Sequence, residues 1–370
     1  MVSLSEIYVK GSVSMNGLKR LQNYLCRESY DGAVLISPTN LHYFTGFTGT
    51  TGYALILHHQ AFFITDGRYT EQAKQECQGY TVIQYEKNPW QAMNKALKSV
   101  MPKGHACLFE GNYVPVDTYE DFCNVLTFDG FKSYNFSNLR AIKTEEELVK
   151  MRQAAKIADD SFAALLPQLH PGMTENEARI LLEKEMLMRG SDEPSFTTII
   201  ASGVRSCMPH GVASDKVIEE GDFVTFDFGA VYEGYHSDMT RTIVMGTASE
   251  LQRKLYASVL KAQKKGVAAV HAGMTGKELD AVCRDSLTAD GYGDKYTHGT
   301  GHGVGLEIHE LPVASPRSTD TLEENMVVTV EPGIYFPEEI GLRIEDSVIV
   351  TREGCEVLTH TSKDLIELDK

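Results

Sequence analysis

Hydrophobic and polar positions follow two different rhythms along the chain. From Gly32 to about Ser137, short apolar runs alternate with polar stretches, and one of these, Trp90 to Val100, has helical spacing. Short apolar runs alternating with helical stretches predict a small α/β domain. The runs are AVLI at 33–36, YALIL at 53–57, AFFIT at 61–65, TVIQY at 81–85 and ACLFE at 106–110, with HHQ at 58–60 as the expected hairpin loop.

A long amphipathic helix marks the start of a second domain. The stretch KTEEELVKMRQAAKIADDSFAALL opens with a capping box, Thr144 to Glu147, which is typical of a helix start. Apolar residues then recur at helical spacing, at Leu148, Met151, Ala155, Ala158, Phe162 and Leu165. Since domains commonly span about 100 to 200 residues, a chain of 370 residues fits two. We take Asn135 to Lys143 as the linker and expect domains at 1–138 and 139–370.

The second domain contains an internal repeat. HPGMTENE at 170–177 and HAGMTGKE at 271–278 share the pattern His-x-Gly-Met-Thr-x-x-Glu, offset by 271 − 170 = 101 residues. In each copy a glycine ends one helix, and Thr174 with Glu177, or Thr275 with Glu278, caps the next. Strand-like stretches follow both copies. We therefore expect two related α/β halves that face each other across a cleft.

Four acidic residues interrupt the strand-like stretches of these halves. Asp227 lies within FVTFDFG, Asp238 follows 238 − 227 = 11 residues later after a turn near Glu233 and Gly234, Glu331 ends VVTV, and Glu345 lies within LRIEDSVIV. A buried carboxylate without a partner costs several kcal/mol or more. One such acid could be exposed at a strand end or paired with Arg241 or Arg343. Four of them beside a cluster of histidines favour a functional site.

The histidines lie in YTHGTGHGVGLEIHE, at 296–310. Its glycines leave room for the backbone to approach ions and substrate, and neutral imidazoles can exchange protons near pH 7. Carboxylates with one imidazole favour hard divalent ions such as Mn²⁺, with Co²⁺, Fe²⁺ or Zn²⁺ as alternatives. Several carboxylates are more than one ion needs, so we expect two divalent ions that activate water for hydrolysis.

Motifs of other enzyme classes that look similar do not match this sequence. His298 and His302 are four residues apart, but Gly-Thr-Gly lies between them where a zincin needs a helix with a glutamate base. GTGHGVG does not complete a dinucleotide-binding GxGxxG, and the DFG at 227–229 lacks the other kinase motifs.

Composition narrows the class of protein further. The net charge of −16 and the lack of a basic stripe argue against nucleic-acid or membrane partners. The apolar runs are too short to span a bilayer, and the first residues, MVSLSEIYVKGSVS, lack the apolar core of a signal peptide, so we expect a cytoplasmic protein. The cysteines lack CxxC spacing and are expected as reduced thiols that fill the core, at Cys26, Cys77, Cys107, Cys123, Cys207, Cys283 and Cys355.

The order of motifs DFG, SDMTRT, THGTGHGVGLEIHE, EPG and RIED resembles the pita-bread metallopeptidases, from Thr144 to the C-terminus. That family includes aminopeptidase P, prolidase and methionine aminopeptidase, with creatinase as a relative that is not a peptidase. SPTNLHYFTGFTGT and FITDGRYTEQA resemble the creatinase-like N-terminal domain of aminopeptidase P and prolidase, which methionine aminopeptidases lack. The resemblance implies an α/β (α+β) fold, with a small creatinase-like domain before a pseudo-two-fold pita-bread domain.

The resemblance also implies metal ligands. They are Asp227, Asp238, His302, Glu331 and Glu345. In the family pattern Asp238 and Glu345 bridge both ions, Asp227 belongs to one ion, and His302 with Glu331 belongs to the other. Glu331 also takes a proton from the attacking water.

Further catalytic residues are implied in the same way. His210 of MPHG, His298 and His309 match histidines that contact substrate, hold the oxyanion or move protons, and Arg343 matches an arginine beside the site. The residues alone support two of these, since His298 and His309 flank His302 at distances of four and seven positions. His210 alone would be assigned to a surface turn. We expect structural roles for His58, His59, His170 and His271, the last two bonding backbone.

These observations predict a metallopeptidase that releases the N-terminal residue from peptides with proline second, an Xaa-Pro aminopeptidase. The alternative is an Xaa-Pro dipeptidase (prolidase), which would share every ligand. A non-catalytic peptide-binding relative and a creatinase-like amidinohydrolase are disfavoured because all five ligands are present. The expected partners are small peptide substrates, and the resemblance implies a homodimer.

Overall fold

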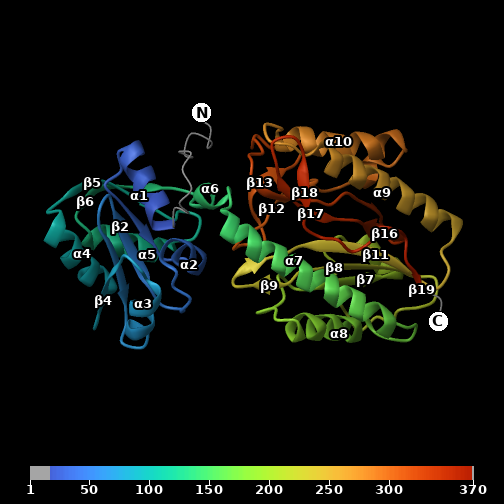
Figure 1. Ribbon diagram of the computed structural model, residues 1–370, viewed down its shortest axis with the longest axis horizontal. Coiled ribbons are helices and arrows are strands. Elements are labelled where there is room, and N and C mark those ends of the chain that lie inside the picture. Colours follow the sequence, from blue (N-terminus) through green and yellow to red (C-terminus); the bar gives the residue numbers. More distant parts are fainter. Residues whose placement is uncertain (1–16, 369–370) are drawn as a thin grey trace. The chain divides into compact units, whose positions relative to one another are not determined.

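The computed structural model describes residues 17–368 (Figure 1). The first 14 residues, on which the expectation about a signal peptide rests, lie outside the described residues. The chain divides after Arg140 into two compact units. The predicted boundary after residue 138 falls inside the short helix α6 (Ser137–Arg140), so the expected linker contains a helix.

The first unit is built on one six-stranded mixed sheet in the order β4-β3-β2-β1-β5-β6. Its strands are β1 (Gly32–Leu35), β2 (Tyr53–Leu57), β3 (Ala61–Thr65), β4 (Thr81–Gln84), β5 (Gly104–Phe109) and β6 (Phe128–Ser133). The hairpin loop predicted at 58–60 is confirmed, because β2 and β3 pair antiparallel and the Leu57 N–H donates to the Gln60 carbonyl at 2.8 Å. The pattern missed β6, an edge strand in which no residue is fully buried.

Helices cover both faces of this sheet because successive strand residues point to opposite sides. Ala33 and Leu35 pack into a cluster with α1 and α2, whereas Val34 packs with α4 and α5 on the other face. The helices of the unit are α1 (Gly17–Glu28), α2 (Pro38–Thr45), α3 (Thr70–Glu76), α4 (Pro89–Val100), α5 (Val116–Val125) and α6.

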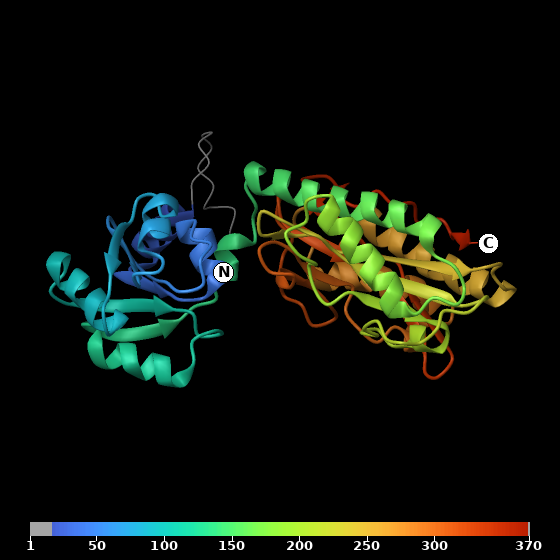
Figure 2. The ribbon, with the colours of Figure 1, turned by 90° about the horizontal axis from the view of Figure 1, so that it is seen from below.

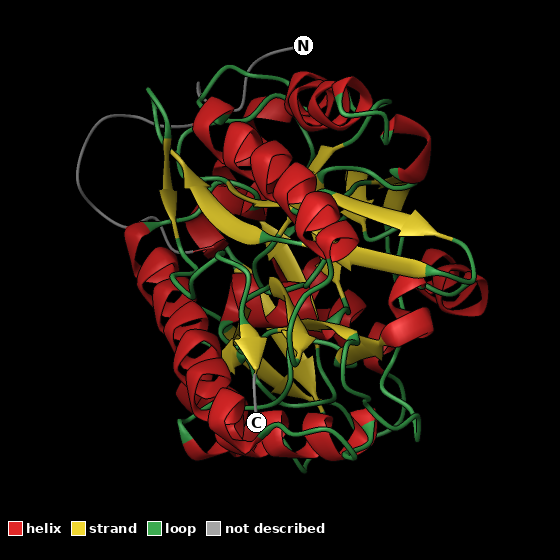
Figure 3. Ribbon diagram, turned by 90° about the vertical axis from the view of Figure 1, so that its right-hand side faces the viewer, coloured by secondary structure: helices red, strands yellow, loops and turns green. Residues whose placement is uncertain are grey.

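The second unit contains two similar halves. Each half contributes a pair of packed helices and a sheet, and Figure 3 shows the helices outside the strands. The helices are α7 (Glu145–Leu165) and α8 (Glu175–Met188) in the first half, and α9 (Glu250–Ala269) and α10 (Gly276–Ala289) in the second. Seen from below in Figure 2, α7 and α8 lie against the strands of their half. Among residues 17–368 there is no helix of the length and apolar character that crossing a membrane requires.

One sheet of each half carries the site. In the first half the order is β19-β11-β8-β7, and in the second it is β13-β12-β14-β17-β18. The strands are β7 (Ile199–Ser202), β8 (Phe223–Phe228), β11 (Met239–Met245), β12 (Gly301–Gly303), β13 (Glu310–Ala314), β14 (Val327–Val330), β17 (Asp346–Val350), β18 (Cys355–Val357) and β19 (Glu367–Leu368). Two short hairpins complete the unit, β9 (Val231–Tyr232) with β10 (Tyr235–His236) and β15 (Gly333–Phe336) with β16 (Ile340–Arg343).

The predicted helix starts are confirmed. Capping boxes form at Thr144, Thr174 and Thr275, in each case with the glutamate three residues later. The apolar positions predicted for α7 are all buried. The glycines of the repeat, Gly172 and Gly273, have nearly equal positive φ of 95° and 94°, a conformation that L side chains rarely adopt.

The repeat continues further than its first motif indicates. VIEEGDFVTFDFG at 217–229 aligns with TLEENMVVTVEPG at 321–333, offset by 321 − 217 = 104 residues. The Gly172 N–H donates to the Ile218 carbonyl at 2.9 Å, and the Gly273 N–H donates to the Leu322 carbonyl at 2.8 Å in the second half. This alignment puts Asp227 and Glu331 at equivalent positions, so the internal symmetry brings two acids to one centre.

Candidate metal centre

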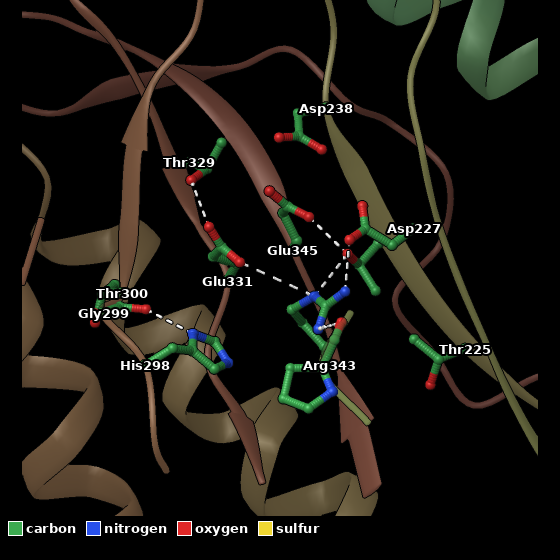
Figure 4. Close-up of polar contacts among 12 residues, drawn as sticks. Thr225, Asp227, Asp238, His298, Gly299, Thr300, Thr329, Glu331, Arg343 and Glu345 are labelled. Atoms are coloured by element: carbon green, nitrogen blue, oxygen red, sulfur yellow. Dashed lines mark hydrogen bonds and ion pairs between the residues drawn. The ribbon is translucent and has the colours of Figure 1, made fainter. Parts of the chain in front are cut away.

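Strand pairing brings three carboxylates together. Asp227 lies in β8, Asp238 comes just before β11, and Glu345 comes just before β17. The predicted turn between the first two is confirmed, with positive φ at Glu233 and Gly234, and it folds β11 back along β8. The two halves meet where the Glu345 N–H donates to the Thr240 carbonyl at 3.2 Å. One oxygen from each carboxylate lies within 4.8 Å of the others, and Figure 4 shows the three groups converging.

His302 links this group to Glu331. Its Nε2 lies 3.5 Å from Asp238 Oδ2 and 3.5 Å from Glu331 Oε1. Thr329 on β14 orients both residues, since its hydroxyl accepts from the His302 N–H at 3.0 Å and donates to Glu331 Oε1 at 3.1 Å. The Glu331 N–H donates to the Thr300 carbonyl at 2.8 Å. The five predicted ligands therefore form one continuous cluster.

Three carboxyl groups of the cluster have raised pKa values, so a nearby positive charge would stabilise their ionised forms. Burial, followed by repulsion from Glu345 and Asp227, raises the pKa of Asp238 well above its ordinary value. Burial, followed by repulsion from Glu331 and Asp227, does the same to the pKa of Glu345. Burial also raises the pKa of Glu331 to about 7. Carboxylates this close together share a space that favours their neutral forms unless a cation is present.

The residues fit divalent cations. Asp227 Oδ1 and Glu345 Oε1 are buried and make no hydrogen bond, although both belong to groups that normally find a partner. A cation would satisfy these oxygens. The donor set of four carboxylates and one imidazole is the kind that oxygen-preferring divalent ions take.

Arg343 lies inside the cluster and is fixed on all sides. Its guanidinium donates to Asp227 Oδ2 at 2.5 Å and to the Tyr335 hydroxyl at 2.7 Å, and its Nε donates to the Thr240 hydroxyl at 3.1 Å. The same Nε lies 3.9 Å from Glu331 Oε2. Arg343 thus offsets part of the negative charge and holds Asp227 in place.

Tyr335 is a site residue that the sequence did not reveal. Its hydroxyl accepts from Arg343 and lies 3.0 Å from His298 Nε2, so it joins the arginine to a histidine. The side chain is buried in β15, where a tyrosine after EPG would be assigned to the core. Only its position two residues after Gly333 of that motif could have drawn attention to it.

One cavity of about 540 Å³ collects all the predicted site residues. It is lined by His210, Asp227, Asp238, His298, His302, His309, Glu331, Arg343 and Glu345, together with apolar side chains that include Phe196, Ile199, Val212, Ile308 and Val313. The His302 and His309 rings lie 4.2 Å apart between centroids. Burial lowers the pKa of His298 to about 4 and also lowers the pKa of His309, so both rings are neutral near pH 7.

The other histidines lie outside this cavity. His170 Nδ1 is 2.9 Å from the Pro171 carbonyl, and His271 Nδ1 is 2.9 Å from the Ala269 carbonyl, which confirms that both bond backbone. His58 Nε2 lies 2.6 Å from the Tyr30 carbonyl.

Comparison with known proteins identifies the family to which the chain belongs. The model of metallopeptidase family M24 matches residues 149–352, and that of the creatinase/prolidase N-terminal domain matches residues 18–176. The chain is 40% identical to the Xaa-Pro dipeptidase of Pyrococcus furiosus over 352 residues, which cover 94% of this chain and 99% of that protein.

Solved structures are similar over the same length. The Xaa-Pro dipeptidase from Bacillus anthracis has 43% sequence identity and a TM-score of 0.92, covering 96% of this chain and 100% of that one. The X-Pro aminopeptidase from Thermotoga maritima has 36% identity and a TM-score of 0.88, covering 95% of this chain and 99% of that one. Both units and the whole cluster therefore lie within the region that is shared.

Proposed function

The chain belongs to metallopeptidase family M24, and from that premise we propose that it is an Xaa-Pro dipeptidase, a prolidase. The observation that carries this proposal is the near full-length similarity to proteins named Xaa-Pro dipeptidase, at 40% and 43% identity. The sequence alone favours the aminopeptidase as the main hypothesis, with the dipeptidase as its alternative. The similarity to an X-Pro aminopeptidase at 36% identity keeps that activity as the second candidate.

Two divalent cations are proposed to be held by Asp227, Asp238, His302, Glu331 and Glu345. The two buried oxygens that make no hydrogen bond, one on Asp227 and one on Glu345, support this assignment. When bound, such cations lower the pKa of a water molecule and polarise the scissile carbonyl. The oxygen-rich donor set favours Mn²⁺ among the divalent metals.

Glu331 is proposed to accept the proton of the attacking water. Its side chain is 17% exposed and lines the cavity together with the other four proposed ligands. A carboxylate beside the attacking water can act as its general base. The same group can then release the proton later in the cycle.

The histidines are proposed to serve the leaving group. Cleavage before proline releases a ring nitrogen that must gain a proton. A neutral imidazole can relay to it the proton that Glu331 accepted from water, because one ring nitrogen donates while the other accepts. His298, His309 and His210 all line the cavity around the cluster. Apolar residues such as Phe196 and Ile199 offer a surface for the proline ring.

Substrate length tests the proposal. The full chain with Mn²⁺ is assayed on Met-Pro, on the tripeptide Met-Pro-Ala, and on Met-Ala as a control for proline dependence. We expect Met-Pro to be cleaved with a kcat/KM at least about tenfold above that of the tripeptide. Faster cleavage of Met-Pro-Ala would support the aminopeptidase instead, and equal cleavage of Met-Ala would contradict proline selectivity. A cytoplasmic location and a homodimer stay predictions.

A further inference from the structure

The two copies of the internal repeat differ at one informative position. HPGMTENE has Glu175 where HAGMTGKE has Gly276. Glu175 is the first residue of α8, and its side chain is 0% exposed. The capping box of this helix is made by Thr174 and Glu177, so Glu175 is not needed to begin the helix. A fully buried carboxylate requires partners of its own.

Those partners all come from one segment of the chain. Ser202 donates to Glu175 Oε1 through its N–H at 2.8 Å and its hydroxyl at 2.9 Å. Ser214 donates to Glu175 Oε2 through its N–H at 3.0 Å and its hydroxyl at 2.7 Å. Arg205 forms an ion pair with the same oxygen. One carboxylate therefore joins both ends and an interior point of segment 202–214.

This segment carries His210 to the cavity. Pro209, His210 and Val212 line the cavity, and Arg205 Nη2 also donates to the Val212 carbonyl at 2.9 Å. The His210 side chain is exposed, so its position depends on the backbone that presents it. We infer that Glu175 is a positioning residue, which holds segment 202–214 so that His210 faces the metal centre.

In the second half, the start of α10 holds a wall of the cavity without a carboxylate. A Cβ at Gly276 would collide with the carbonyl of Val313, so β13 packs directly on the start of α10. Val313 lines the same cavity. In both halves the start of the second helix thus holds a wall of the cavity. Direct backbone contact does this at Gly276, whereas Glu175 spans a longer distance with its side chain.

The inference rests on the proposed peptidase function. One readout of its test, amide hydrogen exchange, does not depend on that function. Glu175→Gln keeps the shape of the side chain but removes the charge that pairs with Arg205. In the Mn²⁺-loaded full chain we expect kcat/KM on Met-Pro to fall about tenfold or more, which is typical of a displaced catalytic group. Amide hydrogen exchange in residues 203–214 should become faster. Glu177→Gln, two residues away, is the matched control and should change neither value.

A double mutant separates positioning from general damage. In a His210→Ala background, Glu175→Gln should lower kcat/KM by less than about threefold, because residues that act as a unit are not additive. The inference would be overturned if Glu175→Gln lowered kcat/KM equally in the parent chain and in the His210→Ala variant. It would also be overturned if Glu175→Gln left hydrogen exchange in residues 203–214 unchanged. Ser214→Ala removes one hydroxyl donor and replaces Glu175→Gln if that variant does not fold, with a smaller loss expected in the same direction. If the parent chain does not cleave Met-Pro, the proposed function fails, and hydrogen exchange still decides the structural claim.

Discussion

The ion pair of Lys143 and Glu310 gives a quantitative test of the second unit. Their side chains are 1% and 0% exposed, and the Lys143 ammonium also donates to the Ala141 carbonyl at 3.1 Å. Lys143→Met keeps the length of the side chain but removes the ammonium of this buried ion pair, and breaking a buried pair by removing one partner typically costs about 3–5 kcal/mol. Each kcal/mol lowers Tm by about 2–4 °C in a unit of this size, so the expected fall is roughly 6–20 °C.

Scanning calorimetry of the parent chain and three variants measures this effect. Lys156→Met is the matched control, because Lys156 and its partner Asp160 are 64% and 52% exposed and such pairs contribute at most about 1 kcal/mol. The double variant Lys143→Met with Glu310→Gln removes both charges and should regain more than half of the loss. If Lys143→Met melts within about 2 °C of Lys156→Met, the reasoning about a buried pair is refuted.

Three further predictions concern the centre and the thiols. Glu331→Gln should fold normally, as circular dichroism would show, and lose at least about a thousandfold in kcat, because it removes the proton acceptor; near-normal turnover with metal present would rule out that role. After chelation, burial leaves the folded-state pKa of Glu331 at about 7 against an ordinary 4.5, so this group contributes stability that is present below pH 4.5 and lost as pH rises through 7. Thermal melts of the metal-free chain should then lose more stability between pH 4 and pH 8 than melts of the metal-free Glu331→Gln variant, and Mn²⁺ should reverse most of the loss of the parent chain at pH 8; the same loss in both chains would argue against this reasoning. A thiol reagent should modify exposed Cys26 in the native chain, whereas Cys77 and Cys283, whose pKa values burial raises to about 11 and about 12, should react only after denaturation.

Local patterns predicted much of the fold. Apolar runs located β2 and β3, and the Thr-x-x-Glu boxes located the starts of α7, α8 and α10, because both signals depend on neighbouring residues. The matches to the M24 and creatinase/prolidase models confirm the predicted fold class. The edge strand β6 was missed because its sequence, FDGFKS, contains no apolar run.

Residues that act through long-range contacts could not be found from the sequence. Tyr335 has the pattern of a core residue in a strand, and Glu175 that of an ordinary acid in the first turn of a helix. Their roles depend on partners such as Arg343 and Ser214, whose positions follow from tertiary packing. The two candidate activities share every predicted ligand, so the spacing of motifs could not separate them.

The extended repeat is a signal of the centre that the amino-acid sequence does contain. Aligning residues 217–229 with 321–333 places Asp227 opposite Glu331. Two acids at equivalent positions of facing halves indicate a shared centre on the axis between those halves.

A crystal grown with excess Mn²⁺ and measured at the manganese absorption edge tests the central claim most directly. We predict two anomalous peaks per chain, both in contact with Asp238 and Glu345, one also with Asp227 and the other with His302 and Glu331. A single peak, peaks elsewhere, or no peak at these five side chains would contradict a dinuclear centre.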